Sequence, residues 1–225
     1  MRIFHTKNDF TGILLQTINR WGVPQSSVAD GILSSVNPLL TGALENAVRD
    51  LFLFRPKIVT PAMKMRLDLS PYDADLIGSD RIAVCEAAVA NDQAPLIVFD
   101  FGTATTVNVV GEQSRFLGGA ILPGLTMGVD ALSRNTAMLP LIELSQQTPL
   151  IGKNTRECIV SGALFGGAAM LDGMAARVEK SLGQSVTVIV TGGNAAYIAP
   201  ICERQICFAP DLLVEGLYCL YHENS

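Results

Sequence analysis

A single acidic residue interrupts an apolar run near the middle of this sequence. The run extends from Leu96 to Asp100, and Gly102 follows it, with threonines at 103, 105 and 106. Its length and branched side chains predict a buried strand. Because a buried carboxylate is costly, we expect Asp100 to lie where the strand meets solvent or an ion. Gly102 allows a tight turn whose exposed amides can bind an anion, although Asp and Thr side chains that merely cap their own hairpin explain the pattern equally well.

A second polar cluster, Gly78-Ser79-Asp80-Arg81, stands directly before an alanine-rich segment. Residues 82–91 place their apolar side chains on one face, which predicts a helix with the cluster at its N-terminus. Asp80 could there accept a proton from a substrate hydroxyl, and Arg81 could bind a substrate carboxylate through its planar guanidinium. Ser79 or Asp80 acting only as the helix N-cap is the simpler interpretation.

Polar residues also precede a long helix that the pattern predicts over residues 156–180. Lys153 and Thr155 are candidate ligand contacts there, whereas Asn154 or Thr155 acting as an N-cap is the structural alternative. Gly152-Lys153 does not form a phosphate-binding P-loop, because the upstream glycine and its spacing are missing.

Glycine and other small residues mark further places where the backbone must approach a neighbour closely. The pair Gly192-Gly193 follows a predicted strand at 185–190 and could admit a nucleotide base or phosphate, although most such pairs only make turns. The helix at 156–180 carries a face of small residues, which predicts tight packing within the fold or across a dimer. This face consists of Ser161, Gly162, Ala163, Gly166, Gly167, Ala168 and Ala169.

Strands that alternate with helices predict an α/β fold. A polar segment at 91–95 separates two halves, 1–93 and 94–225. No GxGxxG motif opens a strand–helix–strand unit, which argues against a dinucleotide-binding dehydrogenase. Besides the segments already described, we predict helices at 9–21, 39–51, 125–135 and after Asp211, and strands at 28–34, 56–60, 107–110 and 116–122.

Composition narrows the possible function classes. Of the 225 residues, 49% are hydrophobic and 16% charged, which is typical of a globular protein. The net charge of −5 and the lack of a basic run argue against nucleic acid as a partner. We expect a cytoplasmic protein without a membrane partner, because no apolar signal core and no bilayer-length apolar segment is evident. Five scattered cysteines predict free thiols, and two histidines at opposite ends argue against a His-based zinc site or catalytic triad.

The order and spacing of these motifs resemble the type III pantothenate kinases, which belong to the acetate and sugar kinase/Hsp70/actin superfamily. The resemblance runs through the chain, is strongest from Gly78 onward, and includes the looser match Ser34-Ser-Val-Asn-Pro38. The matching segments are Gly78-Ser-Asp-Arg81, Asp100-Phe-Gly-Thr-Ala-Thr-Thr106, Gly118-Gly-Ala-Ile-Leu-Pro-Gly124, Gly152-Lys-Asn-Thr155, Thr191-Gly-Gly193 and Pro210-Asp-Leu-Leu-Val-Glu-Gly216.

The resemblance implies an α/β fold of two ribonuclease-H-like, actin/sugar-kinase-type halves around a cleft, the first half truncated at its N-terminus. It implies ATP-dependent phosphorylation of pantothenate to 4′-phosphopantothenate, the first step of coenzyme A biosynthesis. A homodimer is implied as well, which agrees with the small-residue face of the long helix.

Position by position, the resemblance makes Asp80 the catalytic proton acceptor. Gly78, Ser79, Asp80 and Arg81 would line the pantothenate site, and Thr155 would also contact pantothenate. One carboxylate near the hydroxyl suffices chemically, because phosphoryl transfer passes through a loose transition state in which positioning and charge neutralisation matter most.

The resemblance assigns the nucleotide side to two other residues. Thr103 would contact ATP, and Asp100 would bind a monovalent cation, potassium or ammonium, that offsets phosphate charge. Magnesium would enter with ATP, because the sequence shows no pair of carboxylates that would form a magnesium cage.

The sequence departs from the family pattern in two places. Members of the family begin with a strand and an Asp-x-Gly-Asn-Thr phosphate-binding loop. This sequence does not contain that loop, and its first residues match the part of the family pattern that follows it. A non-catalytic relative that keeps the fold and the dimer surface is therefore an alternative to an active kinase. Tyr72 falls about one residue from the position of a family tyrosine that lines the substrate pocket, so we do not assign it to pantothenate.

Overall fold

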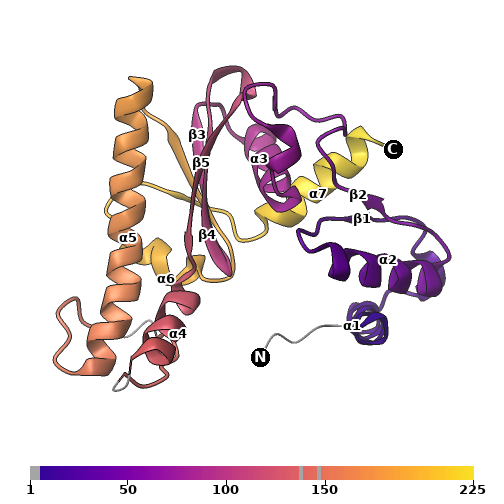
Figure 1. Cartoon of the computed structure of the whole chain (residues 1–225). Coiled ribbons are helices and arrows are strands. Elements are labelled where there is room, and N and C mark those ends of the chain that lie inside the picture. Colours follow the sequence, from indigo (N-terminus) through magenta and orange to yellow (C-terminus); the bar gives the residue numbers. More distant parts are fainter. Residues whose placement is uncertain (1–5, 137–138, 146–147) are drawn as a thin grey trace. The chain divides into compact units, whose positions relative to one another are not determined.

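The computed structural model describes residues 6–136, 139–145 and 148–225 of the chain (Figure 1). The chain divides into two compact units. The first comprises residues 1–65, 73–87 and 213–225, and the second comprises residues 66–72 and 88–212. This division differs from the single predicted boundary after residue 93, because the C-terminal helix belongs with the N-terminal unit.

The first unit combines helices with a small parallel sheet. Thr6 begins the first helix through a capping box, in which Asp9 bonds back to the Thr6 backbone. Asn37 caps the second helix by accepting from the N–H groups of Leu39 and Leu40, and Pro38 occupies the first turn. The elements are α1 (Lys7–Arg20), η1 (Gln25–Ser27), β1 (Ile32–Leu33), α2 (Pro38–Phe52), β2 (Lys57–Ile58), η2 (Ala74–Leu76), α3 (Ser79–Asn91) and α7 (Leu212–Glu223). Helix α3 belongs to this unit up to residue 87, and α7 belongs to it from residue 213 onward.

Helix α7 packs closely against α3 within this unit. The backbone at Gly216 lies so near the Ala83 carbonyl that an added Cβ would overlap its oxygen. The same helix is also bonded to the sheet, since Tyr221 donates to Asp30 at 3.1 Å and Lys57 pairs with that carboxylate at 2.8 Å. The Lys57 hydrogen bond accordingly holds the pKa of Asp30 below its usual value, with a further contribution from the Gly31 backbone.

The second unit is built on a five-stranded sheet of order β5-β4-β3-β6-β7. Strands β3, β4 and β5 are antiparallel neighbours, while β6 and β7 run parallel to β3. The hairpin predicted on either side of Gly102 is confirmed as β3 and β4, and the predicted combination of strands and helices in an α/β fold is confirmed as well. The strands are β3 (Leu96–Phe101), β4 (Ala104–Val110), β5 (Phe116–Pro123), β6 (Thr187–Thr191) and β7 (Cys207–Phe208), with η3 (Glu112–Ser114) between β4 and β5.

Helices α4 (Leu125–Asn135), α5 (Thr155–Leu182) and α6 (Ala195–Ile198), with η4 (Ala199–Ile201), cover one face of this sheet (Figure 1). Alternate residues of β3 point toward them, as the two-residue period of a strand requires. Phe99 and Phe101 there join Leu171 of α5 and Ile198 of α6 in one buried cluster. This core fixes the end of β3, where Asp100 lies, relative to α4 and α6.

Helix α5 is long and apolar enough to cross a membrane by length and composition, with a mean hydropathy of 1.5 over its most apolar 18 residues. The prediction that no segment reaches that length is therefore wrong by this criterion. A core helix of a soluble protein meets the same criterion, and 39% of this window is buried inside the protein. Its buried side, which includes Leu164 and Leu171, belongs to the core beneath the sheet.

Candidate functional site

The cluster at residues 78–81 forms the N-terminus of α3 in the first unit, as predicted. The helix starts at Ser79, so Asp80 lies in its first turn, where its Oδ1 accepts from the Arg81 backbone N–H at 2.8 Å. The Asp80 side chain is half-buried and Arg81 is buried, at 7% exposure. Asp80 therefore bonds to its own helix terminus through Oδ1.

Residues of the segment before α2 lie against this cluster. The hydroxyls of Ser34 and Ser79 are 2.9 Å apart. A Cβ added at Gly78 would overlap Asp80 Oδ1 and approach the Val36 side chain to 3.2 Å, so only glycine leaves room for the carboxylate in this position. Ser34 and Val36 belong to the Ser34–Pro38 segment of the family resemblance, but the sequence alone did not identify them as neighbours of Asp80.

Cys85 lies one turn further along α3 and is fully buried. Burial raises the pKa of the Cys85 thiol to about 12, with smaller effects of opposite sign from the charges of Arg81 and of the carboxylates of Asp80 and Glu86. The thiol is therefore protonated at neutral pH and does not act as a nucleophile.

Asp100 lies at the end of β3 in the second unit, half-buried as expected. It is paired in register with Thr106 of β4 and Thr191 of β6. Gly192 crosses directly over the Asp100 side chain with a φ of +98°, and a Cβ at this position would overlap Asp100 Oδ1. Glycine is needed here for both its backbone conformation and its lack of a side chain.

Three segments meet around the β3–β4 turn. A Cβ at Gly124, the N-cap of α4, would overlap the carbonyl oxygen of Thr103. Asn194, in the loop after β6, donates its backbone N–H to the Phe101 carbonyl at 2.9 Å and its side-chain amide to the Gly102 carbonyl at 3.5 Å. The turn is therefore held by the start of α4 and by the Gly192–Asn194 loop.

A cavity of about 850 Å³ opens beside this turn. Gly102 and Thr103 line it from the turn, Gly193 and Asn194 line it from the loop, and one face of α4 forms its long wall. The sequence pointed to Thr103 and to the glycine pair, but it gave no signal for α4 or for Asn194 as part of this cavity.

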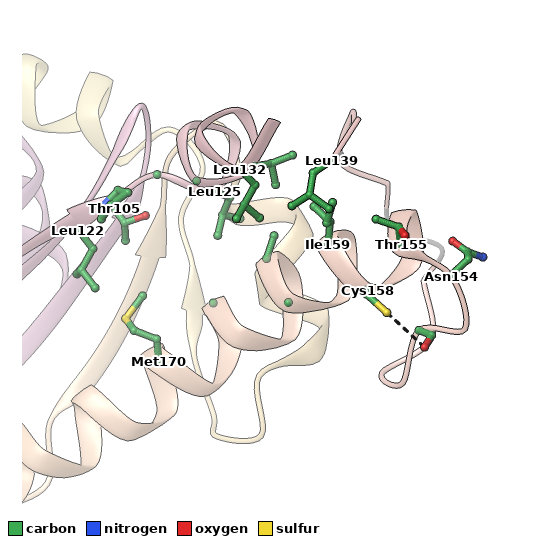
Figure 2. A pocket seen from close by; sticks show the side chains of 18 of the residues that line it. Thr105, Leu122, Leu125, Leu132, Leu139, Asn154, Thr155, Cys158, Ile159 and Met170 are labelled. Carbon is green, nitrogen blue, oxygen red and sulfur yellow. Dashed lines mark hydrogen bonds between the residues drawn. The ribbon is translucent and has the colours of Figure 1, made fainter. Parts of the chain in front are cut away.

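Thr155 lines a different cavity of the second unit, an apolar one of about 920 Å³ beside α5 (Figure 2). The predicted cap before it is confirmed for Asn154, whose Oδ1 accepts from the Glu157 N–H at 3.0 Å. Thr155 is the exposed first residue of α5, whereas the buried Thr105 lies at the other end of the cavity. Thr103 and Thr155 are not brought together in one cavity.

The structure thus places the predicted residues in three local groups. Gly78, Ser79, Asp80 and Arg81 share one helix terminus in the first unit. Asp100 and Thr103 share the β3–β4 hairpin in the second unit, and Thr155 lies at the start of α5. Among the described residues, no group of three or more His, Cys, Asp or Glu side chains could hold a metal ion.

Tyr72, which the sequence left unassigned, lies in the second unit and packs on the sheet. Its ring meets Phe116 edge-on, with centroids 5.0 Å apart. It also lies 3.5 Å from the position that a Gly118 Cβ would take. These contacts pack the half-buried Tyr72 ring against β5.

The sequence is similar to proteins of one named family. A family profile described as type III pantothenate kinase matches residues 2–177. Relatives named type III pantothenate kinase occur in Bacillus cytotoxicus (33% identity over 98% of this chain and 84% of the relative), Geotalea uraniireducens (36% over 96% and 85%) and Exiguobacterium (37% over 96% and 85%). A Baf family protein from Campylobacter jejuni has a similar fold, with a TM-score of 0.59 and 21% identity over 87% of this chain and 83% of that protein.

Proposed function

Because this chain belongs to the type III pantothenate kinase family, we propose that it transfers the γ-phosphoryl group of ATP to the primary hydroxyl of pantothenate, which gives 4′-phosphopantothenate for coenzyme A biosynthesis. The observation that carries this proposal is the half-buried Asp80 at the N-terminus of α3, within the segment that resembles the family's substrate motif. The test is ADP formation in a coupled assay, with and without pantothenate. Absence of turnover by the folded chain would favour the non-catalytic relative, whereas turnover independent of pantothenate would reject pantothenate as the substrate.

Asp80 is the proton acceptor in this reaction. As the pantothenate hydroxyl oxygen attacks the γ-phosphorus, its proton passes to the Asp80 carboxylate, and ADP leaves with the bridging oxygen. The Arg81 N–H bond to Oδ1 fixes the orientation of the carboxylate before the substrate arrives. A strong base is not needed, because the hydroxyl proton is lost late in a loose transition state.

The residues beside Asp80 at the start of α3 are proposed to bind pantothenate. Arg81 is buried, and a desolvated guanidinium binds the carboxylate of pantothenate more strongly than an exposed one would. Ser79 and Gly78 line the same helix terminus, whose N–H groups favour negative charge. The family resemblance also assigns a pantothenate contact to Thr155, at the start of α5 in the second unit.

The nucleotide occupies the cavity beside the β3–β4 turn. Turn amides and the N-terminus of α4 offer positive partial charge to phosphate oxygens, and the Thr103 hydroxyl can donate to them. Gly193 and Asn194 close the opposite side of the same cavity. Fixed dipoles of this kind stabilise the charge that develops during phosphoryl transfer.

Asp100 fits a monovalent cation, potassium or ammonium. Its carboxylate oxygen is a hard donor, and the half-buried side chain lies at the end of β3, next to the β3–β4 turn that borders the nucleotide cavity. A bound monovalent cation supplies positive charge near the phosphates. Asp100 itself orients that charge from the end of a rigid central strand.

Potassium is therefore expected to raise kcat/KM for ATP about tenfold over tetramethylammonium at equal ionic strength, because a carboxylate oxygen can coordinate potassium directly, whereas the methyl groups of tetramethylammonium keep its charge away from Asp100. In the Asp100→Asn variant we expect most of this stimulation to disappear, since the amide carries no charge. Initial rates at matched chloride concentration measure the effect. Equal rates in the two salts would show that Asp100 holds no activating cation.

The protein is proposed to form a homodimer through α5. Gly162 and Gly166 are exposed on this helix, and a Cβ at either position would meet nothing within 4 Å. Gly162 also borders the apolar cavity, together with Leu125, Leu132 and Ile159. A smooth face beside an apolar groove suits close contact with a second helix of the same kind.

The Gly162→Glu variant is expected to shift the protein from dimer to monomer, because the added carboxylate would be buried without a partner in the interface. Light scattering after size-exclusion chromatography measures the mass. The matched control is Gly12→Glu on α1, whose Cβ also meets nothing within 4 Å. A dimer that survives Gly162→Glu would exclude this face as the interface.

We propose a cytoplasmic location. All five cysteines, Cys85, Cys158, Cys202, Cys207 and Cys219, are free thiols, two of them exposed. Exposed thiols persist in a reducing compartment, which is also where ATP is available.

A further inference from the structure

The face of α4 that lines the nucleotide cavity carries one carboxylate. Thr126, Asp130 and Arg134 follow one another at four-residue spacing along this face, and Met127, Ala131 and Asn135 lie beside them. The N-terminus of the helix is held at the β3–β4 turn, which is the proposed phosphate site, by the contact between Gly124 and Thr103. Thr126, Asp130 and Arg134 therefore lie at increasing distance from the β3–β4 turn along the helix.

Asp130 lies one turn, about 6 Å, beyond Thr126 along the helix. A carboxylate repels phosphate oxygens, so the phosphate chain is favoured at the turn and disfavoured at Asp130. The part of a nucleotide that follows the phosphates at this distance is the ribose. Its 2′ and 3′ hydroxyls are donors, and an ionised carboxylate is purely an acceptor.

The Asp130 side chain stands where two cavities meet. Besides the nucleotide cavity, it lines a neighbouring cavity of about 340 Å³, which shares Thr126 and Asn194 and also includes Tyr197. The Asp130 side chain is 34% exposed, and its Oδ2 lies 3.9 Å from Nη2 of Arg134. The Arg134 contact engages one carboxylate oxygen loosely, which leaves the carboxylate able to accept hydrogen bonds from a ligand.

On the premise of the proposed kinase function, we propose that Asp130 binds the ribose 2′-hydroxyl of the nucleotide and makes the enzyme select ribonucleotides over 2′-deoxyribonucleotides. A nucleotide that lacks the 2′-hydroxyl leaves the half-buried carboxylate one hydrogen bond short. Loss of a hydrogen bond to a charged group weakens binding about tenfold or more.

The test is isothermal titration of the full-length protein with magnesium ATP and magnesium 2′-deoxyATP. The parent protein is expected to bind ATP about tenfold more tightly, and Asp130→Ala is expected to bind the two nucleotides within about twofold of each other. Glu203→Gln is the matched control, because Glu203 is an exposed carboxylate of the same unit that lines neither cavity. It is expected to keep the preference for ATP.

The ratio of the two affinities is the decisive readout, since a purely structural defect would weaken both nucleotides alike. Equal affinities in the parent, or a preference that survives in Asp130→Ala, would overturn the inference. Pantothenate-dependent turnover of ATP, measured on the same samples, separates the two claims. Turnover together with equal affinities would reject the role of Asp130 but keep the proposed kinase function. Absence of both nucleotide binding and turnover would reject both claims.

Discussion

Replacement of Asp80 by asparagine is expected to lower kcat about 1000-fold, because an amide cannot accept the hydroxyl proton. The fold should persist, since the amide oxygen of asparagine can still accept from the Arg81 N–H as Oδ1 does. We expect the free energy of unfolding to stay within about 0.5 kcal/mol of the parent. Steady-state kinetics at saturating ATP and pantothenate, together with denaturant unfolding, measure both quantities.

The matched control is Asp73→Asn. Asp73 is an exposed acid a few residues before the same helix and makes no side-chain capping bond, so its replacement removes the same charge without touching the site. Near-parental kcat is expected for this variant. If Asp80→Asn also kept near-parental kcat, Asp80 would not be the proton acceptor, and a water or another group would have to take that role.

The Gly216→Ala substitution is expected to destabilise the protein by about 3 kcal/mol, the upper part of the usual range for overpacking. The new methyl group would overlap the Ala83 carbonyl oxygen, which is backbone of α3 and cannot rotate away as a side chain can. Helix α7 must therefore shift as a whole. A fall in the thermal midpoint of about 6–12 °C is expected for a chain of this size.

The same glycine-to-alanine change at Gly12 provides the control. Gly12 lies inside α1, where a Cβ meets nothing within 4 Å, so only the helix propensity changes. That change is stabilising by up to about 1 kcal/mol. Equal midpoints for Gly216→Ala and the parent would mean that the α3–α7 contact is looser than the structure indicates.

Much of the second unit could be predicted from the sequence because its signals are local. Helix α4 spans the predicted residues 125–135, and the hairpin around Gly102 follows from a branched apolar run and a turn residue. The cap at Asn154 was also visible, since an amide before a helix with an acid in its first turn is a local pattern. These features depend on neighbours within a few residues.

Features that depend on distant partners were harder to predict. The predicted strands at 28–34 and 56–60 are shorter in the structure, where they form β1 (Ile32–Leu33) and β2 (Lys57–Ile58). A residue counts as part of a strand only where it pairs with a neighbouring strand, and these two parallel strands pair at two positions each. Strand β7 was missed altogether, since its pairing with β6 and not its own exposed residues defines it.

The candidate site divides along the same line. Asp80, Asp100, Thr103 and Thr155 stood out by type and position beside a predicted strand or helix end. Asp130 did not, because an acid inside an amphipathic helix looks like an ordinary solvated residue until the cavity beside that helix is seen. Helix α5 was misjudged for a different reason. Its many glycine and alanine residues made the segment look less apolar than its mean hydropathy shows, so the sequence analysis did not recognise a segment of bilayer length.

The return of residues 213–225 to the first unit makes that unit depend on contacts between distant parts of the sequence. Tyr221 of α7 bonds to Asp30 across 191 residues, and Gly216 of the same helix packs on Ala83 of α3. The sheet and the covering helices of the second unit come from residues 88–212 and join residues that are less far apart in the sequence. Because contacts between distant residues cost more loop-closure entropy and form more slowly, we expect the first unit to fold more slowly than the second.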